Sequence, residues 1–272
     1  MIQAPNPSQP LITRRALITG ASEGIGRELA VVMGKKGWEL ILIARREKLL
    51  QELSQELKER FGAISYVFPA DLSNDNTSEL IAQFISDNQL FPDCLVNNAG
   101  FGYYGEFSSH PYSLLKDMIE VNIKSLVLLT HLMLKSMIEK KSGWIVNIAS
   151  VAGFQPLPSM ALYSATKSFV LNFSIAISHE LKKTGIKVVC VCPGSTITGF
   201  ARVASGGKDS RYTPASMSAS QVAELTYKAI ISGKTLTITG FHNRLSALIS
   251  RHLPLELSSQ IAGYILSRRN RR

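Results

Sequence analysis

The chain has 272 residues, of which 45% are hydrophobic, and its 30 basic and 20 acidic side chains give a formal net charge of +10. This length and composition fit one domain with one large core. The longest apolar runs, such as residues 40–44 and 125–129, are far shorter than the roughly 20 residues of a membrane-spanning helix, so no such helix is expected. The basic excess favours anionic ligands, among which nucleotides, acyl carriers, nucleic acid and anionic lipid all qualify.

The amino-terminal segment and the cysteines bear on location and metal binding. Residues 1–12 hold three prolines and no apolar signal-peptide core, so we expect a flexible lead-in and a cytoplasmic protein. Cys94, Cys190 and Cys192 form neither a CxxC pair nor an even set for bridges. We therefore expect reduced thiols and no metal site.

Short β-branched runs alternate with helical patterns from residue 16 to about residue 240, which is typical of a parallel sheet covered by helices on both faces. One helix is expected over residues 47–61, where leucines recur at helical spacing, and another after a capping box formed by Ser218 and Gln221. The alternation predicts a single doubly wound α/β domain over residues 13–272. The expected strands span residues 16–19, 39–44, 65–69, 94–97, 144–148, 187–192 and 236–239.

The first expected strand runs into a glycine-rich turn and then into a helical stretch. The turn reads Thr19-Gly20-Ala21-Ser22-Glu23-Gly24-Ile25-Gly26. Gly20 permits a tight turn, Gly24 lets the backbone approach a pyrophosphate, and Gly26 lets the helix pack close to the sheet. The N–H groups at the start of the helix would then face the phosphates. A glycine triplet alone often marks only a flexible turn, but the order of strand, turn and helix predicts a dinucleotide site in a Rossmann-type fold.

The G-x-x-x-G-x-G spacing resembles the short-chain dehydrogenase/reductase family, and the resemblance extends over about residues 16–240. The family's fourth-strand signature is present as Asn97-Asn98-Ala99-Gly100, in which the resemblance implies that Asn98 steadies the central sheet. Asp71 matches the place where the family holds the adenine, although by itself it fits a turn or helix cap equally well. The cofactor contacts implied in this part of the chain are Gly20, Ser22, Glu23, Gly24, Ile25, Gly26, Asp71, Leu72, Asn98, Ala99 and Gly100.

The end of the second expected strand reads Ala44-Arg45-Arg46. An NAD-binding protein places an acidic residue here for the ribose hydroxyl, whereas an arginine attracts the 2′-phosphate of NADP(H). A charge-assisted hydrogen bond contributes about 1.5–3 kcal/mol, so one contact would favour NADPH by roughly tenfold to a hundredfold. Two solvated charges at a helix start are the alternative, which is weakened because cations are disfavoured there. We expect NADP(H) as the cofactor, with Arg45 as the first candidate for the phosphate and Arg46 as the second.

A tyrosine and a lysine supply the candidate proton-transfer group. Tyr163 and Lys167 stand four residues apart on an expected helix and therefore share one face. A neighbouring ammonium would lower the pKa of the phenol from about 10 towards the working pH. The spacing alone is weak, since Tyr112 repeats it with a lysine four residues later, but only Tyr163 has a serine thirteen residues upstream. That serine, Ser150, follows an expected strand at the ligand edge of the sheet; elsewhere it would be interpreted as a loop cap.

The resemblance assigns roles to this group. In the family the serine hydrogen-bonds the substrate oxygen, the lysine also holds the nicotinamide ribose, and an asparagine in an earlier helix supports a water-linked proton relay. Asn122 stands at the matching position, although an isolated asparagine is more often a helix-surface residue. The implied catalytic residues are Asn122, Ser150, Tyr163 and Lys167. Pro193, Gly194 and Thr198 match the family's P-G-x-x-x-T, which implies further cofactor contacts beside Tyr163 and Lys167, although Pro-Gly alone usually marks a turn.

Together, the residues that match the family imply hydride transfer between NADP(H) and a ketone or secondary alcohol. One hypothesis is reduction of a 3-oxoacyl thioester or another lipidic carbonyl; a second is a small-molecule carbonyl reductase or hydroxy-amino-acid dehydrogenase. A non-catalytic NADP(H) sensor is an alternative of another class. We expect a homodimer or homotetramer, and no nucleic-acid partner because no recognised module supports one.

Two segments bear on the substrate and on further partners. Residues 195–214 lack periodicity and are predicted to be a substrate lid. Residues 241–272 form a basic amphipathic extension that would lie on a membrane, cover a lipid-like substrate or pack on another subunit; an ordinary packed helix with a solvated basic end is equally consistent. Its apolar stripe comprises Leu245, Leu248, Ile249 and Leu253, beside Arg244 and Arg251 and before Pro254, and residues 261–266 precede Arg268, Arg269, Arg271 and Arg272.

Overall fold

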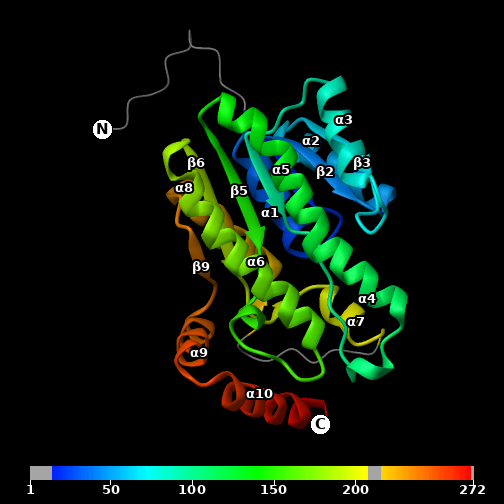
Figure 1. Ribbon diagram of the computed structural model, residues 1–272. Coiled ribbons are helices and arrows are strands. Elements are labelled where there is room, and N and C mark those ends of the chain that lie inside the picture. Colours follow the sequence, from blue (N-terminus) through cyan, green and yellow to red (C-terminus); the bar gives the residue numbers. More distant parts are fainter. Residues whose placement is uncertain (1–13, 208–215, 271–272) are drawn as a thin grey trace.

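A parallel sheet of seven strands runs through the computed structural model, in the order β3-β2-β1-β4-β5-β6-β9 (Figure 1). The structure describes residues 14–207 and 216–270. The predicted strands are confirmed with ends shifted by at most one residue. They are β1 (Arg15–Thr19), β2 (Glu39–Ala44), β3 (Ser65–Pro69), β4 (Cys94–Asn97), β5 (Gly143–Ile148), β6 (Ile186–Cys192) and β9 (Leu236–Ile238).

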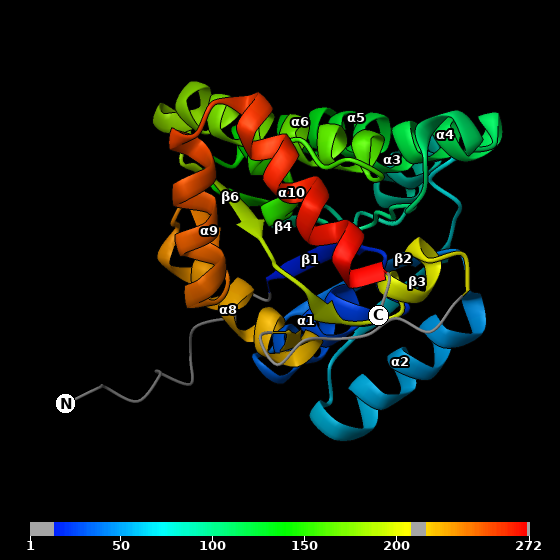
Figure 2. The same cartoon turned by 90° about the horizontal axis from the view of Figure 1, so that it is seen from below.

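Helices cover both faces of the sheet, which confirms the doubly wound α/β fold (Figures 1 and 2). One layer holds α1 (Gly24–Lys35), α2 (Glu47–Phe61) and α8 (Ala219–Ser232). The other holds α3 (Thr77–Asp87), α4 (Tyr112–Ile119), α5 (Ser125–Glu139) and α6 (Ala161–Glu180). The short 3-10 turns are Phe107–Ser109, Val151–Phe154 and Leu181–Lys183.

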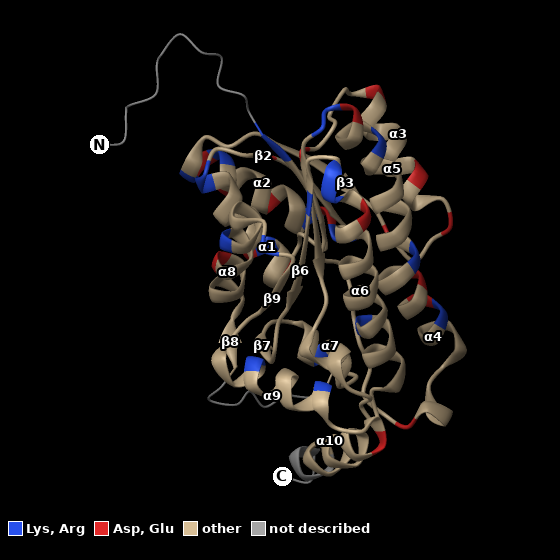
Figure 3. Cartoon of the chain, turned by 60° about the vertical axis from the view of Figure 1, so that its left-hand side comes forward, with Lys and Arg blue, Asp and Glu red and all other residues tan. Residues whose placement is uncertain are grey.

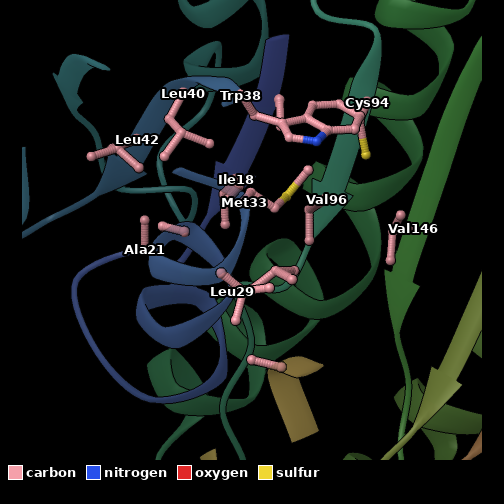
Figure 4. Packing of buried hydrophobic residues seen from close by; sticks show 14 of the residues in the cluster. Ile18, Ala21, Leu29, Met33, Trp38, Leu40, Leu42, Cys94, Val96 and Val146 are labelled. Carbon is pink, nitrogen blue, oxygen red and sulfur yellow. The ribbon is translucent and has the colours of Figure 1, made fainter. Parts of the chain in front are cut away.

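Alternate residues of each strand enter opposite cores because side chains point to alternate faces of a sheet. On β2, Leu40 and Leu42 join the core under α1 and α2, shown in Figure 4, while Ile41 and Ile43 join the core under α3 and α5. Cys94 lies in the first of these cores, and burial raises the pKa of its thiol above the ordinary value. All three cysteines are buried free thiols.

Local signals in the two predicted helices are also confirmed. In α2 the residues Leu50, Leu53 and Leu57 are buried at helical spacing. At the start of α8 the Ser218 hydroxyl accepts the N–H of Gln221, and the Gln221 side chain accepts the N–H of Ser218.

The longest helical run among the described residues bears on the expected absence of a membrane-spanning helix. The helices α4 and α5 join through a π-helical segment, Glu120–Lys124, so that Tyr112–Glu139 forms one run of 28 residues. Its most apolar 18-residue window has a mean hydropathy of 1.3. By length and composition alone this run would cross a membrane. A helix that covers a sheet meets the same criteria, and 39% of its most apolar window is buried inside the molecule. It is therefore weak support for a membrane span.

The predicted lid contains regular structure that the sequence pattern did not indicate. The strand β7 (Thr196–Ile197) pairs with β8 (Met217–Ser218), and the helix α7 (Phe200–Ala204) lies between them in the chain. The rest of the lid, residues 208–214, and the lead-in of residues 1–12 lie outside the described residues. The carboxyl-terminal helices are α9 (Phe241–His252) and α10 (Leu255–Asn270), separated at Pro254 as the sequence indicated.

Candidate functional site

The predicted site residues gather at the carboxyl edge of the sheet. They follow the ends of β1, β2, β3, β4, β5 and β6 or lie on the helices beside them, and the strand order reverses between β1 and β4. Ligands of open parallel sheets bind at such a switch point. The fold therefore brings together residues that are far apart in the sequence.

A buried threonine ties β1 to β4 beneath the glycine turn. The Thr19 hydroxyl accepts the N–H groups of Asn98 and Ala99, both at 3.0 Å, and donates to the Val96 carbonyl. The Asn98 amide in turn donates to the carbonyls of Thr19 and Gly20 at 2.8 and 3.2 Å. This network links the end of β1 to the loop after β4.

Replacing Thr19 by Val is expected to lower the free energy of unfolding by about 1–3 kcal/mol, because two buried N–H groups lose their acceptor. The matched control is Thr226→Val on α8: that hydroxyl, also buried, only donates to the Val222 carbonyl, so its loss should cost less than about 1 kcal/mol. Urea unfolding of both variants measures the difference. Equal losses of unfolding free energy in the two variants would show that the N–H groups bonded to Thr19 add no stability.

The glycine turn packs so closely on neighbouring segments of the chain that side chains at its glycines would clash. Gly20 has φ +66°, and a Cβ on Gly26 would stand 2.4 Å from the Asn98 amide nitrogen and 2.5 Å from the Gly20 carbonyl oxygen. The helix α1 begins at Gly24 with no side-chain capping bond and no acidic residue in its first turn. Such a helix start presents backbone N–H groups to an anion.

The two arginines after β2 have different partners. The Arg46 guanidinium donates to Ser22 at 2.9 Å and pairs with Glu23 at 3.0 Å, so it is tied to the glycine turn. The Arg45 side chain is 74% exposed and, within the part of the chain that the structure describes, pairs only with Asp71, at 3.7 Å. Asp71 also caps the turn after β3 by accepting from Ser73, which was the alternative interpretation of that residue. A loose surface pair of this kind contributes little to stability.

Ser150, Tyr163 and Lys167 converge next to the end of β5. Tyr163 and Lys167 are both buried on α6, with the Lys167 Nζ 5.9 Å from the centre of the phenol ring. Lys167 donates to the Ile148 carbonyl at 2.9 Å. Ser150 hydrogen-bonds to Tyr163 and accepts the N–H of Ala152. Ser150 thus both caps its loop and hydrogen-bonds to Tyr163.

The charge states of this group differ from the sequence-based expectation. Burial raises the pKa of Tyr163 to about 12, and the hydrogen bond with Ser150 offsets part of that rise. Burial lowers the pKa of Lys167 to about 8, and the nearby thiols of Cys190 and Cys192 offset part of that change. The ammonium was expected to lower the pKa of the phenol, whereas burial is the largest influence on that pKa and raises it. Tyr163 is therefore a protonated phenol at neutral pH.

Asn122 occupies the π-helical segment and is almost fully buried. Its amide accepts the N–H of Phe101 at 3.0 Å and donates to the Phe101 carbonyl and to Thr166. A Cβ on Gly100 would stand 3.1 Å from the Asn122 Oδ1 and 3.2 Å from the Lys167 Nζ. Asn122 is therefore at the site and not on a helix surface, and its side chain positions the loop after β4.

The loop after β6 closes over the glycine turn. A Cβ on Gly24 would lie 3.1 Å from the Thr198 methyl group, and one on Gly199 would lie 2.8 Å from the Glu23 carboxylate. Gly194 abuts Asn243 of α9, whose amide donates to the Thr239 carbonyl. Pro193 precedes this contact, and its carbonyl accepts from the Ser150 hydroxyl at 3.4 Å. The P-G-x-x-x-T segment thus lies beside both the turn and the catalytic candidates.

An apolar wall surrounds the phenol. Tyr163 packs with the buried Met118 and Ala152 and lies 5.2 Å from the Phe200 ring, measured between ring centres. The partly buried members of this cluster are Phe101, Tyr103, Leu114, Leu157, Met160, Leu162 and Phe200. Sequence reasoning did not select Phe200, Asn243 or Thr166, since each is an ordinary residue until the fold places it here.

The comparisons with known proteins agree with this geometry. A family model described as short chain dehydrogenase matches residues 14–208. The chain belongs to the short-chain dehydrogenase family. It is 34% identical over 198 residues to the very-long-chain 3-oxoacyl-CoA reductase of Rattus norvegicus, covering 71% of this chain and 63% of that protein. The chain therefore spans less than two thirds of the length of that relative.

Other relatives are matched over more of their length. Sulfoacetaldehyde reductase 2 of Chromohalobacter salexigens is 36% identical over 220 residues, or 78% of this chain and 86% of that protein. A short-chain dehydrogenase from Sphingobium yanoikuyae, solved in complex with NADPH, has a TM-score of 0.80 at 30% identity over 87% of this chain and 92% of that one. A bulky-bulky ketone specific alcohol dehydrogenase from Comamonas testosteroni has a TM-score of 0.76 at 28% identity, covering 87% and 90% of the two chains.

Proposed function

We propose that this member of the short-chain dehydrogenase family is an NADP(H)-dependent oxidoreductase that interconverts a ketone and a secondary alcohol. The observation that carries the proposal is the convergence of Ser150, Tyr163 and Lys167 beside the glycine turn. The dinucleotide supplies the hydride when bound. Tyr163 donates the proton to the substrate oxygen, and Ser150 hydrogen-bonds that oxygen.

The residues present fit the dinucleotide. The glycine turn and the uncapped start of α1 suit a pyrophosphate. Asp71 and Leu72 remain the predicted contacts of the adenine. The two guanidinium groups of Arg45 and Arg46 after β2 suit a 2′-phosphate. The related protein from Sphingobium yanoikuyae was solved with NADPH, which supports the same choice here. The remaining predicted contacts are Gly20, Ser22, Glu23, Gly24, Ile25, Gly26, Asn98, Ala99, Gly100, Tyr163, Lys167, Pro193, Gly194 and Thr198.

We assign the support of Tyr163 to Lys167 and Asn122. The Lys167 ammonium stabilises the phenolate that remains after proton donation and holds the nicotinamide ribose. Asn122 keeps Gly100 and Phe101 against this group, and its part in a water-linked relay stays a prediction.

The apolar wall around Tyr163 favours a lipidic carbonyl such as a 3-oxoacyl thioester as the substrate. The rat relative is a very-long-chain 3-oxoacyl-CoA reductase, which supports this choice. A series of 3-oxoacyl thioesters tests it: kcat/KM should rise with each added methylene. A small polar aldehyde or ketone is the second candidate, favoured by the likeness to the sulfoacetaldehyde reductase, and a flat series with turnover of small carbonyl compounds would select it.

The buried amine predicts a pH dependence. The pKa of Lys167 lies at about 8, so the amine is charged below that pH and loses its charge above it, while Tyr163, with a pKa of about 12, stays protonated throughout. We expect kcat/KM for NADPH, which reports the free enzyme, to be flat at pH 6–7.5 and to fall about tenfold per pH unit above about 8. In Lys167→Arg the fall should disappear, because a guanidinium keeps its charge. A wild-type profile flat to pH 10 would refute the role of this amine.

The predictions of a cytoplasmic location and of a homodimer or homotetramer complete the proposal. Among the described residues, no cluster of three or more His, Cys, Asp or Glu side chains could hold a metal ion.

A further inference from the structure

The carboxyl-terminal helices lie at the edge of the sheet where the strands end, and α10 crosses beneath that edge (Figures 1 and 2). In an ordinary packed helix the large apolar side chains face the protein, whereas those of α9 are exposed. Its buried residues are the small Ala247 and Ser250, at 2% and 7% exposure. Its apolar side chains are 49% to 76% exposed; this outward stripe comprises Phe241, Leu245, Leu248 and Ile249.

Hydrogen bonds hold α9 in this orientation. The hydroxyls of Ser250 on α9 and Ser258 on α10 both donate to the Gln155 Oε1, at 2.6 and 3.2 Å. At the other end of α9, the Asn243 amide donates to the Thr239 carbonyl at 2.6 Å. Because these polar groups face the body, the outward stripe must face away from it. On α10 the side chains of Leu257, Ile261 and Ile265 are also exposed.

The charge of this region identifies the kind of partner. Residues 241–272 contain six arginines and one glutamate, so they carry +5 of the chain's formal net charge of +10. Arg244 and Arg251 are exposed and flank the outward stripe in the sequence. The helix α9 has no acidic residue, and Figure 3 shows no red segment on it. A second copy of the chain would bring the same positive charge against this face, and like charges repel. A surface with negative headgroups over an apolar interior complements both properties.

We propose that the outward stripe of α9 and the exposed apolar residues of α10 dock on a bilayer surface that contains anionic lipid. The apolar side chains enter the boundary between headgroups and acyl chains, and Arg244 and Arg251 pair with lipid phosphates. This docking is peripheral, because α9 has only 12 residues and remains bonded to the body of the protein. It does not depend on the proposed reaction.

Co-sedimentation of the full chain with vesicles tests the proposal. The probes are vesicles of phosphatidylcholine alone and vesicles with about one third phosphatidylserine, and we expect partitioning to the second to be at least about tenfold stronger and to weaken in high salt. Leu245→Gln with Leu248→Gln should lower that partitioning at least about tenfold. The matched control is Leu80→Gln with Ile231→Gln, at exposed positions of α3 and α8, which should bind like the wild type. The pair Arg244→Gln and Arg251→Gln should also weaken binding, whereas Lys48→Gln and Lys58→Gln on α2 should not.

Three outcomes would overturn the proposal. They are no binding to either vesicle, equal binding to both, or a stripe variant that binds like the wild type. Gel filtration and thermal melting of each variant accompany the assay, since substitutions at exposed positions should leave the fold intact. If the wild type binds no vesicle and the stripe variant turns a dimer into a monomer, then the occupant of this face is a second copy.

Discussion

Tyr163→Phe is expected to lower kcat for ketone reduction by a factor of about 100 to 10,000, the contribution of a positioned general acid. The phenylalanine keeps the apolar contacts of the ring with Met118 and Phe200 and removes only the hydroxyl. Binding of NADPH, followed by fluorescence, should change far less than kcat. Steady-state assays with saturating NADPH measure the effect.

The chain contains its own control for this substitution. Tyr112 has a lysine, Lys116, at the same spacing on α4. However, Tyr112 is 83% exposed, and no serine stands thirteen residues before it in the sequence. Tyr112→Phe should therefore leave kcat unchanged. If both variants turn over at the wild-type rate, Tyr163 is not the acid.

Arg45→Asp is expected to remove the preference for NADPH over NADH and to reverse it. The arginine favours the 2′-phosphate by roughly tenfold to a hundredfold, and an aspartate repels that phosphate and accepts from a ribose hydroxyl. The ratio of kcat/KM for NADPH to that for NADH should fall to one or below. Turnover at saturating NADH should remain, because Tyr163 and Lys167 are untouched.

Two further variants test whether the change in the NADPH/NADH ratio is specific to Arg45 or follows from any change of charge near the site. Lys48→Asp changes the charge by the same amount on the exposed first turn of α2 and should leave the ratio close to that of the wild type. Arg46→Asp should lower the ratio less than Arg45→Asp, because Arg46 already pairs with Glu23 and Ser22. A ratio unaffected by Arg45→Asp would refute the assignment of the phosphate to Arg45.

The strands and the layered fold were predictable because their signals are local. Runs such as Leu40, Ile41, Leu42 and Ile43 are buried on both faces and stand between helical patterns, which only a covered parallel sheet satisfies. The pairing of β7 with β8 was not predictable. Each of these strands has two residues, and the pairing joins Thr196 to Met217 across the sequence.

Residues of the candidate site could be predicted where a residue type, at a fixed spacing from others, implies a particular function. Gly26 allows the close approach to Asn98, and Tyr163 and Lys167 share a helix face. The pKa of the phenol was not predictable, because it depends on the burial that the surrounding helices create. The hydrogen bond from Ser258 to Gln155 was not predictable either, because 103 residues separate the two along the chain.

A single-turnover experiment tests whether the chain transfers hydride from NADPH to a carbonyl compound. The protein is loaded with one equivalent of NADPH and mixed with a medium-chain 3-oxoacyl thioester or with one of a panel of simple ketones, and the nicotinamide absorbance is followed. We expect the absorbance to decay completely with at least one carbonyl compound, and at least about a hundredfold more slowly in Tyr163→Phe. An NADPH signal that shows binding but persists with every carbonyl compound would contradict it and would identify the chain as a binding module.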